Sequence, residues 1–245
     1  MLPTISNGGK EMYIKNTLAI SIGLVLSTMV SAENSVKDSE DTINFADPTV
    51  IYSSFEAAYG TEGATLGFGL ASQINEEWGG LAKYEGKENL NLHRIRAAAT
   101  NTEIGSGILL DYIWDTDFAG AGADSHSLVV NGLQVLPLGE NALFVPMVGA
   151  GFTTNDFAEN EAAIGMLQAM LVYNFSPEVW ANFIPQYTYS FNDLKLKNGD
   201  TQSIRKYEFE TVVGYRFDNN QNVRLLYKYN EDREHEATLS YTYAF

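Results

Sequence analysis

The strongest constraint on the fold is a strict alternation of apolar and polar residues at the end of the chain. In residues 207–217, Glu208, Glu210 and Arg216 occupy one face, and the other face is apolar: Tyr207, Phe209, Val213, Tyr215 and Phe217. Residues 223–230 and 237–245 repeat the pattern. A period of two residues is typical of β-strands with two different faces. The sequence therefore predicts three consecutive antiparallel strands.

The length of these segments favours a membrane. They run to about 9 to 11 residues, which matches a tilted transmembrane strand, whereas strands of soluble proteins average about 5 to 6. Aromatic residues gather at the ends of predicted segments, and we assign Trp78, Trp114 and Trp180 to the two interfacial girdles of such a barrel. We expect the Tyr- and Phe-rich face to contact lipid and the charged face to be enclosed.

The last strand carries a resemblance to a known class. The run ATLSYTYAF places Leu239, Tyr241, Tyr243 and Phe245 at alternate positions up to the final residue. This run resembles the C-terminal signal of Gram-negative outer-membrane β-barrel proteins. Over residues 49–245 the resemblance implies a porin-like barrel in the cell outer membrane, in contact with outer-membrane lipid and lipopolysaccharide. It also implies recognition by the barrel assembly machinery, but it selects no individual family.

The spacing of turns predicts an all-β, antiparallel up-and-down barrel of 12 strands. Asn, Asp, Pro and Gly mark short turns, and longer loops alternate with them. The short turns are expected near residues 75–77, 101–103, 138–141, 176–178 and 218–221. The longer loops are expected near residues 60–63, 86–89, 116–125, 154–161, 192–203 and 231–234. Residues 78–99 alternate poorly, and the alternative is 10 strands if they do not cross the membrane.

The N-terminal region indicates export. Residues 17–30 are apolar but too short for a transmembrane helix, and small residues precede Glu33. We predict a signal peptide over residues 1–32, with Met12 a possible true start. Residues 33–48 are acidic and polar, which predicts a disordered tail; a small plug inside the barrel is the alternative. The barrel then spans residues 49–245.

Composition excludes several functions. The chain has no cysteine, so it has no disulfide and no acylated cysteine. A net charge of −16 argues against nucleic-acid binding through phosphates. No ligand spacing for a metal, no phosphate-binding loop and no cofactor motif are recognisable. The three histidines are His93, His126 and His235, and none lies in a convincing catalytic setting, so we predict no catalytic residue and no enzyme.

The enclosed face provides the candidate functional residues. The predicted pore-lining residues are Glu56, Asp111, Glu208, Glu210, Arg216, Arg224, Lys228 and Glu236. Charges in an enclosed interior must pair or contact water, and we expect Lys228 to lie between Glu210 and Glu236. The first hypothesis is a narrow porin-like channel for small polar or cationic solutes. The alternatives are a non-conducting structural, adhesion or receptor barrel, and a membrane-embedded esterase or protease.

Overall fold

The computed structural model describes residues 43–47 and 50–245. The predicted signal peptide, residues 1–32, and most of the predicted tail lie outside the described residues. In the described part of the chain, no helix is long and apolar enough to cross a membrane.

The described residues form strands almost throughout. One 3-10 turn, η1 (Glu88–Leu90), interrupts them between the third and fourth strands. The strands are β1 (Ser54–Gly60), β2 (Gly63–Gln73), β3 (Trp78–Lys87), β4 (Leu92–Asn101), β5 (Ser106–Phe118), β6 (Ala123–Gln134), β7 (Leu136–Pro137), β8 (Ala142–Asn155), β9 (Ala162–Asn174), β10 (Val179–Ser190), β11 (Leu194–Lys195), β12 (Thr201–Gln202), β13 (Arg205–Asp218), β14 (Gln221–Asn230) and β15 (His235–Ala244).

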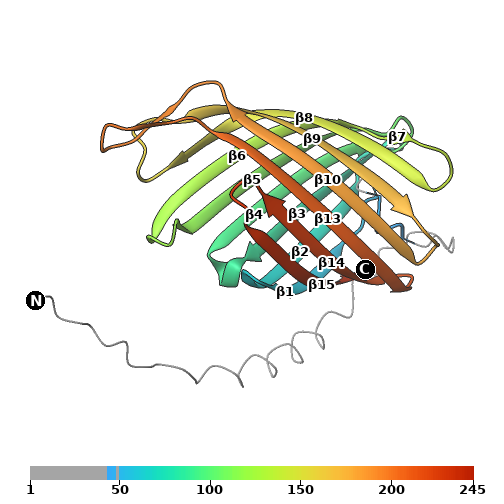
Figure 1. Ribbon diagram of the computed structural model, residues 1–245. Helices are drawn as coiled ribbons and strands as arrows, with labels where there is room; N and C mark the ends of the chain where they lie inside the picture. The colour runs from blue at the N-terminus through green and yellow to red at the C-terminus, as the bar shows by residue number, and fades with distance from the viewer. Residues whose placement is uncertain (1–42, 48–49) are drawn as a thin grey trace, which may run out of the picture. The chain divides into compact units, whose positions relative to one another are not determined.

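Twelve of these strands close into an antiparallel barrel. Each barrel strand pairs with its neighbours in sequence, β1 pairs with the final strand β15, and β6 pairs directly with β8. The short β7 only extends the pairing along β8, and β11 and β12 form a small separate hairpin. Figure 1 shows the long strands lying side by side at a common tilt. The prediction of 12 strands is confirmed, because residues 78–99 form β3 and β4.

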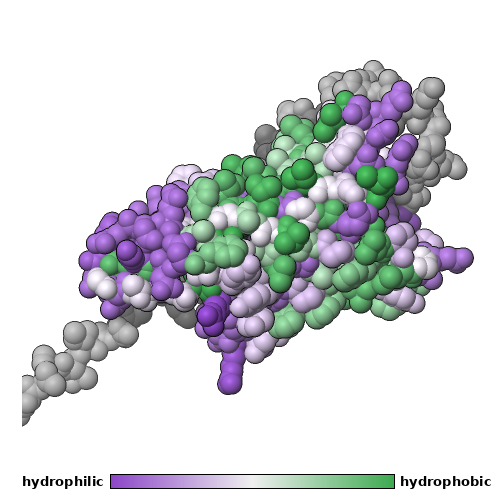
Figure 2. Space-filling model, turned by 90° about the horizontal axis from the view of Figure 1, so that it is seen from above, coloured by the Kyte–Doolittle hydropathy of each residue, from purple (hydrophilic) through white to green (hydrophobic). Residues whose placement is uncertain are grey.

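Alternation along each strand divides the barrel into an apolar outside and a mixed inside. Large apolar residues stay exposed on the outer face of every long strand, Leu66, Ile108, Leu167 and Leu225 among them. Figure 2 shows hydrophobic residues over the middle of the visible face, with hydrophilic residues gathered at the ends. Exposed apolar area of this extent is abnormal on a soluble monomer and typical of a barrel that contacts lipid.

The two ends of the barrel differ. At the end that holds the C-terminus the connections are short turns, as expected. At the opposite end, residues 61–62 and 119–122 are equally short turns, so the longer loops expected near 60–63 and 116–125 do not form. At this end, the β10–β13 connection carries the β11–β12 hairpin and joins the β8–β9 loop. Lys197 N donates to Phe157 O at 2.8 Å, and Glu159 N donates to Lys195 O at 2.7 Å. These two loops therefore form one ordered unit at the loop end of the barrel.

Candidate lumen site

The barrel encloses a cavity of about 510 Å³. Its lining runs from Phe45 and Ala46, near the C-terminal end, to Lys87 and Glu88 at the loop end. Seven of the eight predicted pore-lining residues border it: Glu56, Asp111, Glu208, Glu210, Arg224, Lys228 and Glu236. Arg216 lies on the same face of β13 but binds outside this lining, where its Nη1 donates to Ile43 O at 3.3 Å. The sequence pattern thus places this set on the enclosed face.

A chain of ion pairs crosses the wall formed by β14, β1, β3 and β4. Glu56 lies 2.7 Å from Arg224 Nη2 and 2.6 Å from Lys83 Nζ. Lys83 is also 3.1 Å from Glu85, which in turn pairs with Arg96. The two carboxylates are nearly buried, with 8% and 10% of their side chains exposed. Because such groups are costly to enclose unless paired, each of the two carboxylates lies between two of the three basic side chains.

A second pair continues the charged wall. Arg94 on β4 pairs with Asp111 on β5, and its Nε donates to Asp111 Oδ1 at 2.9 Å. Sequence reasoning missed Lys83, Glu85, Arg94 and Arg96, because β3 and β4 alternate poorly. The signal was present as charged residues at alternate positions, but Ala and Gly opposite them gave no apolar face to recognise.

Lys228 forms a separate cluster near the loop end. Its Nζ lies 3.0 Å from Glu208 and 3.4 Å from Glu236, and Gln186 Nε2 donates to Glu208 at 3.0 Å. The expectation that Glu210 would be one of the two acids is wrong. Glu210 is directly opposite Lys228 in the β13–β14 register, yet the ammonium reaches diagonally to Glu208. A flexible lysine can reach diagonal neighbours across a strand pair as well as direct ones.

The other half of the lumen wall is largely apolar and carries uncharged polar side chains among the apolar ones. It is formed by the inward residues of β6, β8, β9 and β10, chiefly Val129, Val145, Met147, Ile164, Met166, Met170 and Ile184. Sequence reasoning missed the apolar character of this half, because residues 142–152 and 162–173 are largely apolar on both faces and do not alternate. A continuous apolar run is the signal of a strand with two apolar environments. The lumen is therefore divided into a charged wall and an apolar wall.

Residues 43–47 narrow the lumen at the C-terminal end. Phe45 and Ala46 are buried in a cluster with Val172, Trp180, Val212 and Ala244. The Asn44 side chain closes the turn, because its Oδ1 accepts from Ala46 N at 3.2 Å. For these five residues the expectation of a disordered tail does not hold, since the apolar side chains of the INFA run find an apolar surface inside the barrel.

Trp180 belongs to this cluster, which corrects its assignment to the outer girdle. Only 3% of Trp180 is exposed, and its ring lies over Gly214, where any β-carbon would overlap it. Trp180 has the same strand parity as Asn182, so it must face inward. Proximity to a turn had suggested a girdle position, but alternation decides the side on which a residue lies.

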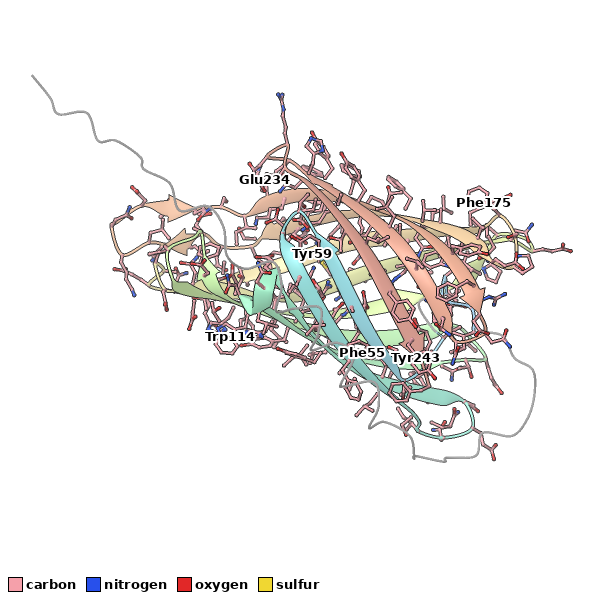
Figure 3. The ribbon with its side chains drawn as sticks, turned by 90° about the horizontal axis from the view of Figure 1, so that it is seen from below. Phe55, Tyr59, Trp114, Phe175, Glu234 and Tyr243 are labelled. Atoms are coloured by element: carbon pink, nitrogen blue, oxygen red, sulfur yellow. The ribbon has the colours of Figure 1, made fainter. Side chains whose placement is uncertain are left out.

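The outer aromatic residues do gather at the two ends. Figure 3 shows Trp114 near the loop end, and Phe55 and Tyr243 together near the C-terminal end. Trp114 faces outward and stacks between His93 and His126, with ring centroids 5.1 and 6.1 Å away. Trp78 begins β3 at the C-terminal end and is half-buried. In the predicted assembly signal, all four residues are exposed: Leu239, Tyr241, Tyr243 and Phe245.

The histidines lie outside the lumen and bind tyrosines. His93 Nδ1 hydrogen-bonds to Tyr84 Oη at 2.8 Å, and His126 Nδ1 to Tyr112 Oη at 2.9 Å. Ser127 borders the lumen cavity, so it lies on the opposite face from His126 and cannot be activated by it. Among the described residues, no group of three or more His, Asp or Glu side chains could hold a metal ion.

At the loop-end mouth, η1 places a carboxyl group beside the cavity. Glu88 lines the cavity, and burial together with the nearby Asp115 carboxylate raises the pKa of Glu88 above its ordinary value. This mouth therefore gains negative charge as pH rises through the raised pKa of that carboxyl group.

Comparison with known structures finds several outer-membrane proteins of similar fold. The KdgM porin matches with a TM-score of 0.51 and 8% identity, over 80% of this chain and 99% of its own. The COG4313 outer-membrane channel from Pseudomonas putida F1 matches with a TM-score of 0.52 and 10% identity, over 83% and 99%. The chain has the fold of the outer-membrane porins.

A third similar structure, the NanC porin, gives a TM-score of 0.51 at 8% identity, over 79% of this chain and 98% of its own. A further KdgM structure was solved in complex with oligogalacturonate. No protein-family model and no curated protein sequence matches the chain. At these identities the comparisons establish the architecture alone, and the chemistry of the lumen depends on the residues of this chain.

Proposed function

We propose that this chain is a narrow channel of the cell outer membrane that passes small polar or cationic solutes through its lumen. The main support for the proposal is that the barrel wall is apolar on its outer face and charged on part of its inner face. The outer face is apolar, whereas the lumen holds charged side chains around a cavity of about 510 Å³. Barrel channels of the outer membrane typically have a polar lumen and an outward-facing apolar band.

The charges in the lumen favour cations over anions. Five carboxylates of the lumen wall are matched by five basic partners: Glu56, Glu85, Asp111, Glu208 and Glu236 with Lys83, Arg94, Arg96, Arg224 and Lys228. Three further charged residues border the cavity without an ion pair among the described residues, the acids Glu210 and Glu88 and the base Lys87, so carboxylates exceed basic groups in this set. Because fixed charges in a narrow lumen sort ions by sign, this excess carboxylate selects against anions. We therefore do not propose that this chain binds an acidic ligand such as the oligogalacturonate of the KdgM structure.

Single-channel recording in planar lipid bilayers tests the proposal. The purified barrel should produce discrete conductance steps in KCl, and a salt gradient should give a reversal potential on the cation-selective side. Residues 43–47 narrow the lumen, so we expect small steps. A barrel that inserts but never conducts would overturn the proposal.

The second candidate is a non-conducting structural or receptor barrel. The plug-like cluster around Phe45 and the ion-paired wall favour it, because both fill space inside the barrel. Recording from Phe45→Ala distinguishes the two functions: absence of conductance in both the wild type and this variant would favour the structural barrel. We propose no enzymatic activity, since His126 and Ser127 lie on opposite faces.

A further inference from the structure

Glu210 lies at the boundary between the charged and apolar walls of the lumen. Near the middle of β13, it is directly opposite Lys228 on one side and Ile184 on the other. Beyond Lys228 the same row continues to Glu236. Beyond Ile184 lie the apolar inward residues of β9 and β8, including Met170. Residues directly opposite in an antiparallel pair have β-carbons about 4.5–5.5 Å apart. A solute touching Glu210 therefore also reaches the apolar wall.

The Glu210 carboxylate is available to a solute. It has no hydrogen bond and no ion pair with any residue that the structure describes, whereas each neighbouring acid in the lumen has at least one. Arg94 interacts electrostatically with Glu210, but its guanidinium is already bound to Asp111 through two nitrogens. The positive charge of Arg94 is thus largely matched, and the negative charge of Glu210 is not.

A second polar residue borders the cavity on the neighbouring strand. Asn182, the inward residue of β10 before Ile184, is directly opposite Val212 and is buried, and its enclosed Oδ1 has no hydrogen-bond partner. Its Nδ2 only contacts Met170 Sδ at 3.7 Å. Buried amide oxygens are normally satisfied, so Asn182 would gain a hydrogen bond if its side chain turned toward a donor in the cavity. An ammonium group, which has three donors and no acceptor, fits a carboxylate and an amide oxygen.

We propose that Glu210 anchors a lumen site for small organic cations with an apolar body. The ammonium binds Glu210, the Asn182 side chain turns to accept a second hydrogen bond from it, and the apolar body lies against Ile184 and the methionines of β8 and β9. The cavity volume falls in the range of about 300–1,000 Å³ that is usual for small-molecule sites. This inference rests on the proposed channel function, because a solute must be able to enter the lumen.

The test measures block of the KCl current by three probes. Benzylammonium combines a cation with an apolar ring, methylammonium lacks the ring, and benzoate has the opposite charge. We expect benzylammonium to interrupt the current at concentrations at least about tenfold lower than methylammonium, and benzoate to have no effect at those concentrations. Calorimetric titration of the detergent-solubilised barrel with benzylammonium measures the same site without requiring conduction.

Variants separate the two halves of the site. Glu210→Gln should weaken benzylammonium block and binding at least about tenfold. Glu140→Gln makes the same charge change in an exposed turn outside the lumen and should leave both unchanged. Ile184→Asn keeps the carboxylate but removes its apolar neighbour, and should abolish the preference for benzylammonium over methylammonium. Heat-dependent migration on SDS gels confirms that each variant has folded.

The outcomes also distinguish the two proposals. Conductance without any preference for benzylammonium, or with equal block of Glu210→Gln and wild type, overturns the organic-cation site and leaves the channel intact. No conductance, together with calorimetric binding that is lost in Glu210→Gln, overturns the channel and supports the site. Benzoate block equal to that of benzylammonium would show that charge at Glu210 does not select the solute.

Discussion

Glu56→Gln should be the most destabilising single change in the charged wall. Glu56 is the common partner of Lys83 at 2.6 Å and Arg224 at 2.7 Å. In the variant, Lys83 keeps Glu85 at 3.1 Å. Arg224 keeps only Ser240 Oγ, to which its Nε donates at 3.3 Å. The cost of the substitution is therefore mainly that of an enclosed guanidinium left without an anion.

The size of the expected loss of stability follows from the unpaired charge of Arg224 in the variant. Removing one partner of a buried ion pair typically costs about 3–5 kcal/mol. The Arg224 side chain is 25% exposed, so water in the lumen compensates part of the loss. We expect the free energy of unfolding to fall by about 3 kcal/mol. Glu236→Gln is the matched control, since its partner Lys228 retains Glu208 at 3.0 Å and is 30% exposed. The control should cost about 0–1 kcal/mol.

Equilibrium unfolding by guanidinium chloride in lipid vesicles, followed by tryptophan fluorescence, measures both variants. The difference between them should be about 2 kcal/mol or more, which is the lower estimate for Glu56 less the upper one for Glu236. If Glu56→Gln and Glu236→Gln lost equal stability, the ion-pair chain would not be the enclosed, mutually dependent unit that the geometry indicates.

Three further predictions concern the inner and outer faces. In single-tryptophan variants, bromine-labelled lipids should quench Trp114 and spare Trp180, which faces the lumen; quenching of both would contradict the inward orientation. Gly214→Ala should destabilise the barrel by about 1–3 kcal/mol, because a β-carbon there meets the Trp180 ring. Gly132→Ala, in open space, should leave the unfolding midpoint unchanged. Phe45→Ala should raise the single-channel conductance by loosening the cluster at the C-terminal end, and an unchanged conductance would show that Phe45 does not restrict the lumen.

Much of the architecture could be predicted from the sequence, because a transmembrane barrel encodes its two environments residue by residue. Alternation at residues 207–245 predicted the strand type, and turn residues predicted the positions of the connections and the count of 12, although two connections expected to be longer loops are short turns. The same alternation put Glu56, Glu210, Lys228 and the other five candidate lumen residues on one face. In a β-strand, residues two positions apart lie on the same face, so assigning one residue to the lumen also assigns its alternate neighbours.

The interior contacts could not be predicted, because they depend on which strands become neighbours and in what register. Closure of β1 on β15 brings Glu56 to Arg224, which is 168 positions distant in the chain. In the strand register Lys228 is directly opposite Glu210. Its long side chain instead extends diagonally to Glu208, so Glu210 has no ion pair among the described residues. Burial of Phe45 against Trp180 likewise requires the finished wall. Strand periodicity is a local property of the chain, whereas ion pairing and the filling of a lumen are decided only by the three-dimensional distances that barrel closure creates.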